Sequence, residues 1–79
     1  MDLPFETQLQ RAFRSGLHLG ERVNYDSLHF ASSPEWDSIA HMQLIAAIEG
    51  EFGIVIDTSD MLAMNSYEKA REIVRKYHP

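Results

Sequence analysis

The 79-residue sequence contains no cysteine, and this absence excludes several kinds of site. The chain itself can form no disulfide framework, thiolate nucleophile or cysteine-ligated zinc site. No apolar run approaches the roughly 18 residues that span a bilayer, and no basic region followed by an apolar stretch opens the N-terminus. From these absences we expect a cytoplasmic protein without a membrane span.

Positive charge is also scarce, with seven lysines and arginines against twelve aspartates and glutamates and a formal net charge of -5. Nucleic-acid affinity rests largely on Lys and Arg contacts to phosphate, so the composition argues against a nucleic-acid partner. An acidic surface suits basic patches on protein partners, although the same charge also serves simply to keep a small protein soluble. No two of the four histidines stand at i, i+4, so we expect no metal site.

A chain of this length holds one domain at most, and we expect a single domain over residues 1–79. Apolar residues recur at helical spacing in three segments, which predicts three main helices. A short fourth helix that contains Met61, Leu62 and Met64 is expected where Thr58 or Ser59 provides an N-cap. The expected fold is all-α, a small four-helix bundle of three main helices and one short helix with a long first loop.

The first helix is predicted to begin near Leu3 or Pro4, because the fixed φ of proline suits an opening turn. Gly16 is predicted to end it in the left-handed conformation. The apolar face of this helix is formed by Phe5, Leu9, Ala12 and Phe13. Residues 17–36 show no period and are rich in turn formers, which predicts a long loop. The side chains expected to pack this loop onto the helices are Leu19, Val23, Leu28 and Phe30.

The second helix is predicted to begin at Asp37 or Ser38 and to run to about Phe52, with Asp37 as its N-cap and Gly53 at its end. It carries two apolar strips. The strip expected to face the core contains Leu44, Ile45, Ile48 and Phe52. The other strip, rotated away from the first, contains Ile39, Met42 and Ala46. One helix with two apolar strips needs two partners, of which one is the core, and the second strip is a candidate surface for docking another molecule.

The last helix is predicted to follow Ser66 as its N-cap. Its apolar face contains Tyr67, Ala70, Ile73, Val74 and Tyr77. We expect Met61 and Met64 to pack in the core, while a flexible pocket for a tethered chain is the alternative.

Ser38 lies in the first turn of the second helix, directly after Asp37. A phosphodiester attached there would lie near the positive end of the helix dipole and near backbone N–H groups. The position therefore suits a phosphate-linked tether, although Asp-Ser is also common as plain capping. A hydrolytic serine needs a base, an orienting group and an oxyanion hole, for which His41 alone is a poor substitute, so a small hydrolase is the least favoured interpretation.

The wider segment resembles a known family. Asp37-Ser38-Ile39 is similar to the Asp-Ser-Leu signature of acyl carrier proteins and of the carrier domains of polyketide and nonribosomal peptide synthases. The segment 44–56 is similar to the family's second helix and its exit, and the spacing from Ser38 to Phe52 and Ile56 fits without a gap. The first helix and the long loop agree in length and pattern only.

The resemblance implies a non-catalytic carrier. A phosphopantetheinyl transferase attaches a 4'-phosphopantetheine arm from coenzyme A to Ser38 of such a protein, with Asp37 and His41 beside the attachment point. The thiol of the arm holds acyl, aminoacyl or related groups as thioesters. A loading ligase supplies these groups, and the carrier, expected to be a monomer, delivers them to downstream transferases or synthases.

The family's second helix is also its recognition helix, so the strip of Ile39, Met42 and Ala46 corresponds to its apolar docking face. Glu49 and Glu51 would supply flanking charge for basic partner surfaces. The sequence departs from typical fatty-acid carriers at three positions that are usually acidic, namely Ala40, Gln43 and Gly50. We therefore expect service in a specialised biosynthetic pathway rather than in general fatty-acid biosynthesis.

Several alternatives stay open from the sequence. The main one is an unmodified helical interaction module that uses the same exposed strip and leaves Ser38 bare. His41 either contacts the phosphate of the tether or is a surface or partly packed residue, and the second is the more frequent role. Trp36 either packs in the core or contacts partners, and we expect it to be mainly packed.

Overall fold

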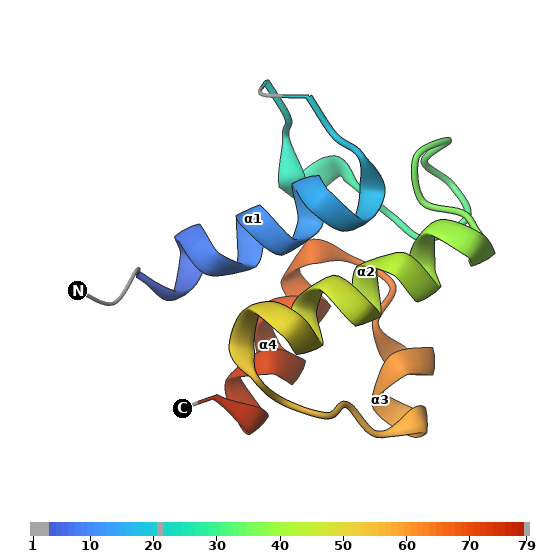
Figure 1. Cartoon of the computed structure of the whole chain (residues 1–79). Coiled ribbons are helices and arrows are strands. Elements are labelled where there is room, and N and C mark those ends of the chain that lie inside the picture. The colour runs from blue at the N-terminus through green and yellow to red at the C-terminus, as the bar shows by residue number, and fades with distance from the viewer. Residues whose placement is uncertain (1–3, 21, 79) are drawn as a thin grey trace.

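The computed structural model describes residues 4–20 and 22–78, and in them the chain forms four α-helices and one short 3-10 helix (Figure 1). In chain order these are α1 (Phe5–Leu17), the 3-10 helix η1 (Tyr25–Ser27), α2 (Ser38–Phe52), α3 (Thr58–Ala63) and α4 (Tyr67–Tyr77). The all-α prediction, with three main helices and one short one, is confirmed. No helix in this described part of the chain is long and apolar enough to cross a membrane.

α1 and α2 lie side by side and run in opposite directions (Figure 1). The rings of Phe5 and Phe52 meet at one end, with centroids 5.4 Å apart. Near the other end, a Cβ atom on Gly16 would lie 2.6 Å from the Cα atom of Leu44. Because real Cβ atoms do not approach a backbone so closely, only glycine permits this packing distance.

The prediction that Gly16 ends the first helix is wrong, since α1 continues to Leu17 and His18 takes the left-handed conformation at φ 55°. Gly16 is required for contact with α2 instead. The predicted start near Pro4 is confirmed, because Pro4 is the N-cap residue. The other predicted start, Leu3, lies outside the described residues.

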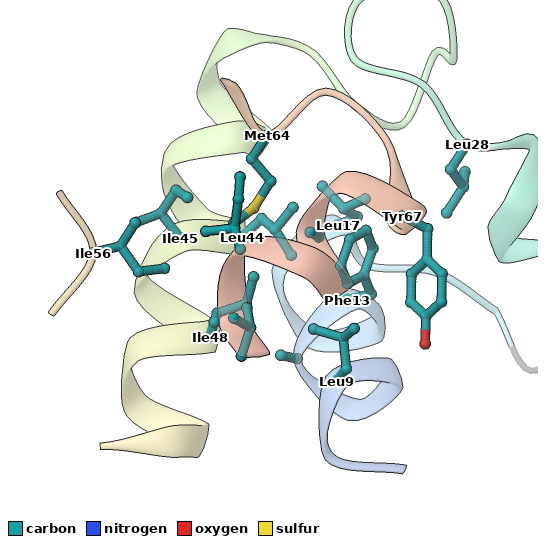
Figure 2. Packing of buried hydrophobic residues seen from close by; sticks show 14 of the residues in the cluster. Leu9, Phe13, Leu17, Leu28, Leu44, Ile45, Ile48, Ile56, Met64 and Tyr67 are labelled. Carbon is teal, nitrogen blue, oxygen red and sulfur yellow. The ribbon is translucent and has the colours of Figure 1, made fainter. Parts of the chain in front are cut away.

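The core lies between α1, α2 and α4, and Ile56 and Met64 close it from the segments that flank α3 (Figure 2). The predicted core strip of α2 is confirmed, because all four of its members are buried. Met64 is also buried and Met61 packs against the core, which confirms core packing for both methionines. The buried members from the three long helices are Leu9, Ala12, Phe13, Leu17, Leu44, Ile45, Ile48, Phe52, Tyr67, Ala70, Ile73 and Val74.

The long loop between α1 and α2 is ordered by apolar packing and by a contact with the start of α4. Leu28 is buried, and the other predicted anchors, Leu19, Val23 and Phe30, are partly buried. The amide of Phe30 donates to the carbonyl of Asn65 at 3.0 Å, beside a bridge between His29 and Ser66. The 3-10 helix within the loop was not predicted. It is capped locally, because the amide of Asp26 donates to Asn24 Oδ1 at 3.2 Å.

α3 is attached mainly by polar contacts. None of its six residues, all of which the structure describes, is buried. The Asp60 carboxylate accepts hydrogen bonds from Lys76 Nζ at 2.8 Å and from the Tyr77 hydroxyl, and these bonds lower the pKa of Asp60. The predicted N-cap at Thr58 or Ser59 is wrong, because the N-cap residue is Asp57 and its side chain makes no capping bond.

α4 is joined to α1 by both packing and charge. Ser66 caps α4 as predicted, accepting from the amide of Lys69 at 3.1 Å. The Glu6 carboxylate of α1 accepts from the Tyr67 hydroxyl at 2.7 Å and from Arg71 Nε at 2.6 Å. Burial alone would raise the pKa of Glu6, but the hydrogen bonds from Tyr67 and Arg71 outweigh it and the pKa lies below its ordinary value.

Candidate functional site

The start of α2 has the capped geometry that the sequence predicts. Asp37 is the N-cap residue, with extended backbone, and its carboxylate accepts from the amide of Ala40 at 2.8 Å. The Asp37 carbonyl accepts from the amide of His41 at 2.8 Å, which begins the helical bonding pattern. Ser38 is the first residue of α2, and it is exposed. Its hydroxyl is therefore placed at a helix start where another molecule can reach it.

The electrostatics of this helix start suit a phosphate ester on Ser38. The amides of Ser38 and Ile39 belong to the first turn of the helix and have no intrahelical acceptor. They add to the positive end of the helix dipole, which stabilises a nearby phosphate. The first turn of α2, which the structure describes in full, contains no acidic residue, and the carboxylate of Asp37 just before it is held on the amide of Ala40. The residues present thus fit a phosphate-linked group with an outward path to solvent.

His41 does not serve as a base for Ser38. Trp36 Nε1 lies 2.9 Å from His41 Nδ1, and because an indole nitrogen only donates, Nδ1 is the acceptor. The proton of the neutral ring is therefore on Nε2, which donates to the Met61 carbonyl at 2.8 Å. Both ring nitrogens are engaged within the domain, so His41 is not free to act as the base that a hydrolytic serine needs.

The same bonds bear on the predicted contact between His41 and a phosphate on Ser38. To make that contact, the ring has to give up its bond to Trp36 or its bond to Met61. The contact stays a prediction, whereas the packing of His41 is a feature of the fold.

Trp36 is a core residue, as predicted. It is fully buried, and its ring meets that of Phe13 edge to face at 5.5 Å between centroids. The sequence did not predict its hydrogen bond to His41. Helical periodicity does not pair residues at i and i+5 across a helix start. The available signal was that a buried indole N–H usually has an acceptor, which indicates a partner for Trp36 but not its identity.

The second apolar strip of α2 is exposed, as its position on the helix predicts. Ile39 is 73% exposed, Met42 is 64% exposed, and Ala46 is exposed as well. Val55, in the connection after α2, and Leu62 of α3 are also exposed large apolar residues. The structure thus leaves apolar side chains uncovered on α2, in the connection after it and on α3. The binding of partners to the strip of Ile39, Met42 and Ala46 stays a prediction.

The charged residues at the far end of α2 are engaged within the domain. One carboxylate oxygen of Glu49 accepts from the amide of Ile56 at 2.8 Å and so closes the turn after α2. Glu51 forms an ion pair with Arg11 of α1, with Nε and Oε1 3.6 Å apart. The predicted role of Glu49 toward basic partners therefore has to coexist with a structural role.

A family model described as phosphopantetheine attachment site matches residues 8–75 of the chain. The match includes α2, α3 and the long loop and covers most of α1 and α4. No curated protein and no solved structure matches the chain.

Proposed function

The chain belongs to the family of phosphopantetheine attachment domains, and we propose that Ser38 is the residue that bears the arm. The group that this domain carries is covalent 4'-phosphopantetheine. The observation that carries the assignment is the exposed Ser38 hydroxyl at the capped start of α2. Among the exposed serines, it alone follows an N-cap whose carboxylate bonds into a long helix.

The residues around Ser38 hold the attachment point, and the bound arm supplies a thiol that carries acyl groups as thioesters. Asp37 keeps its carboxylate on the amide of Ala40, so the amides of Ser38 and Ile39 would be available to a phosphate on Ser38. Ser38 is exposed, so an arm attached there would have access to solvent. Such domains are generally carriers rather than catalysts, and the lack of a base at Ser38 agrees with that role.

We further propose that the strip of Ile39, Met42 and Ala46 binds the enzymes that load and unload the arm. The exposure of Ile39 and Met42 supports this, since exposed apolar side chains close to a functional group often mark an interface. The lack of acidic side chains at Ala40, Gln43 and Gly50 supports partners from a specialised pathway, because the docking would depend on apolar contact more than on charge.

The attachment is tested by intact mass after incubation with coenzyme A and a broad-specificity phosphopantetheinyl transferase. We expect the protein to gain the mass of one arm and Ser38→Ala to gain none while staying folded, because Asp37 still caps α2. Ser59→Ala is the matched control, since Ser59 is an exposed serine in the first turn of α3, and it should be loaded normally. Loading of Ser38→Ala would contradict the assignment.

An unmodified interaction module is the second candidate, favoured by the same exposed strip. In that case several active transferases would leave a verified apo sample unchanged. The docking strip has its own test in loading kinetics. Met42→Glu should raise KM for the carrier, whereas Thr7→Glu introduces the same charge at an exposed position of α1 and should not. Equal KM values for the two variants would argue against the strip as a docking surface.

A further inference from the structure

The short segment that contains Ser38 is bounded by two residues that bond to each other. Trp36, two positions before the serine, is fully buried, and its indole N–H donates to His41 Nδ1 at 2.9 Å. His41 lies three positions after the serine. The rings of the pair also stack, with centroids 6.0 Å apart. The exposed residues Asp37, Ser38 and Ile39 thus lie between two ends that a side-chain bond joins.

Both members of the pair are fixed to other parts of the domain. Trp36 packs on Phe13 of α1, and its carbonyl accepts from the amide of Ala31 at 2.8 Å. His41 donates from Nε2 to the Met61 carbonyl of α3 and lies edge to face against Phe30 of the long loop at 5.1 Å. The pair therefore connects the loop, the start of α2 and α3 at the position where the serine is displayed.

We propose that Trp36 and His41 are positioning residues, which hold the Asp37–Ser38–Ile39 turn in the orientation that the transferase requires. The proposal rests on the assignment of Ser38 as the attachment residue. In the transfer, the serine Oγ loses its proton and bonds to the phosphorus that bears the pantetheine arm, while the pyrophosphate bond of coenzyme A breaks and adenosine bisphosphate leaves. The attacking oxygen has to lie in line with the breaking bond, so small errors in the orientation of the hydroxyl slow the step. Docking through Ile39 and Met42 does not by itself fix that orientation.

The chemistry of the pair indicates which substitutions separate positioning from packing. His41→Leu fills the position with an apolar side chain and leaves the buried indole N–H without its acceptor. His41→Gln retains one acceptor and one donor on a side chain of comparable reach, so it can still bond to Trp36 and to the Met61 carbonyl. Tyr77→Phe is the control, because it weakens the attachment of α3 through Asp57 and Asp60 without touching the pair.

The experiment measures steady-state loading by a phosphopantetheinyl transferase with coenzyme A for the four proteins. His41→Leu removes the bonds to Trp36 and to the Met61 carbonyl, and we expect kcat to fall about five- to tenfold, with KM changed less than about twofold. His41→Gln should recover most of the lost rate. Tyr77→Phe should load at the rate of the parent protein, which excludes a general effect of loosening α3.

Parent-like loading of His41→Leu would overturn the proposal, and so would an equal loss in Tyr77→Phe. Amide hydrogen exchange of Ala40 and His41, whose amides both bond to Asp37, provides a second readout that needs no transferase. Exchange of these two amides should be faster in His41→Leu than in the parent and should be restored in His41→Gln. Unchanged exchange shows that the pair does not order the segment and overturns the proposal, whereas failure of the parent to load overturns the assignment of Ser38 and leaves the ordering of the segment to the exchange measurement.

Discussion

α1 and α3 both contact α2, but different forces attach them. α1 buries Leu9, Ala12, Phe13, Gly16 and Leu17, whereas α3 buries none of its six described residues. α3 is instead bonded to α4 through Asp60 and to α2 through the Met61 carbonyl and His41. Apolar burial is the dominant stabilising term in folding, so α1 belongs to the cooperative core. α3 is attached by the partly buried Met61 and by a few polar bonds, and a helix attached in this way can open locally at a lower free energy.

The difference has a consequence for the proposed function. The serine displayed at the start of α2 is flanked by Trp36, which packs on Phe13 of α1, and by His41, which bonds to α3. The segment around the serine therefore contacts both a helix with a buried face and a helix without buried residues. The following substitutions test how far the two helices differ, in order of their expected effect on global stability.

The largest effect is expected from the core that α1 shares with α2. Leu44→Ala removes a fully buried side chain and should lower the free energy of unfolding by about 3 kcal/mol, because of lost burial and the cavity left behind. Leu62→Ala makes the same change on α3, where the side chain is 81% exposed, and should cost less than about 0.5 kcal/mol. Urea denaturation measures both. Similar losses would show that α3 packs as tightly as α1.

The close approach of α1 to α2 is expected to give the second-largest effect. Gly16→Ala places a methyl group against the backbone of Leu44 and should lower the free energy of unfolding by about 2 kcal/mol, as overpacking does. Gly50→Ala is the matched control, because nothing lies within 4 Å of its added Cβ and it should stabilise α2 by about 0.5–1 kcal/mol. Thermal melts of both variants check the sign, and stabilisation by Gly16→Ala would refute the packing argument.

Acid should weaken the polar contacts of both helices. The pKa of Glu6 is lowered by bonds from Tyr67 and Arg71, which outweigh burial, and that of Asp60 by bonds from Lys76 and Tyr77. A lowered pKa contributes stability that is complete above the ordinary value, 4.5 for Glu6 and 3.8 for Asp60, and is lost as the pH falls through the folded-state value.

Melting temperature measured from pH 7 down to pH 3 checks this dependence. Glu6→Gln should remove part of the acid-induced decrease at a cost below about 1 kcal/mol at neutral pH, because solvent screens the partly exposed ion pair with Arg71. An unchanged slope in Glu6→Gln would mean that other carboxylates account for the loss of stability in acid.

The smallest effect on global stability is expected from Tyr77→Phe, which tests directly whether α3 opens more easily than α1. The change removes the hydroxyl that donates to Asp60 and accepts from the amide of Asp57. The melting temperature should change little, while amide exchange in residues 58–64 should accelerate relative to α1. Uniform acceleration across the chain would show that α3 unfolds only together with the core.

Most of the helical framework could be predicted from the sequence, because the signals are local. The caps at Asp37 and Ser66, the end of α2 at Gly53 and the core strip of α2 each depend on residues a few positions apart. The two wrong helix boundaries also came from local signals. Gly16 and Thr58 satisfy the rules for a helix end and a helix start, but packing against Leu44 and the extended backbone of Asp57 override those rules.

At the candidate site, too, some features could be predicted from neighbouring residues and others could not. Ser38 and its cap could be located from adjacent residues, and the exposed strip from helical spacing. The bond of Trp36 to His41, the bond of His41 to the Met61 carbonyl and the bond of Ile56 to Glu49 could not.

The chain alone therefore determined the family, most of the helices and the position of Ser38 at a capped helix start, because caps, periodicity and a contiguous motif are properties of neighbouring residues. The tertiary structure decided that Gly16 sets the distance between α1 and α2 and that α3 is attached mainly by polar bonds. It also decided that His41 bonds both to Trp36, before the serine, and to the Met61 carbonyl of α3. These features arise where segments distant in sequence meet, so no local pattern encodes them. His41 and Met61, for example, are 20 positions apart.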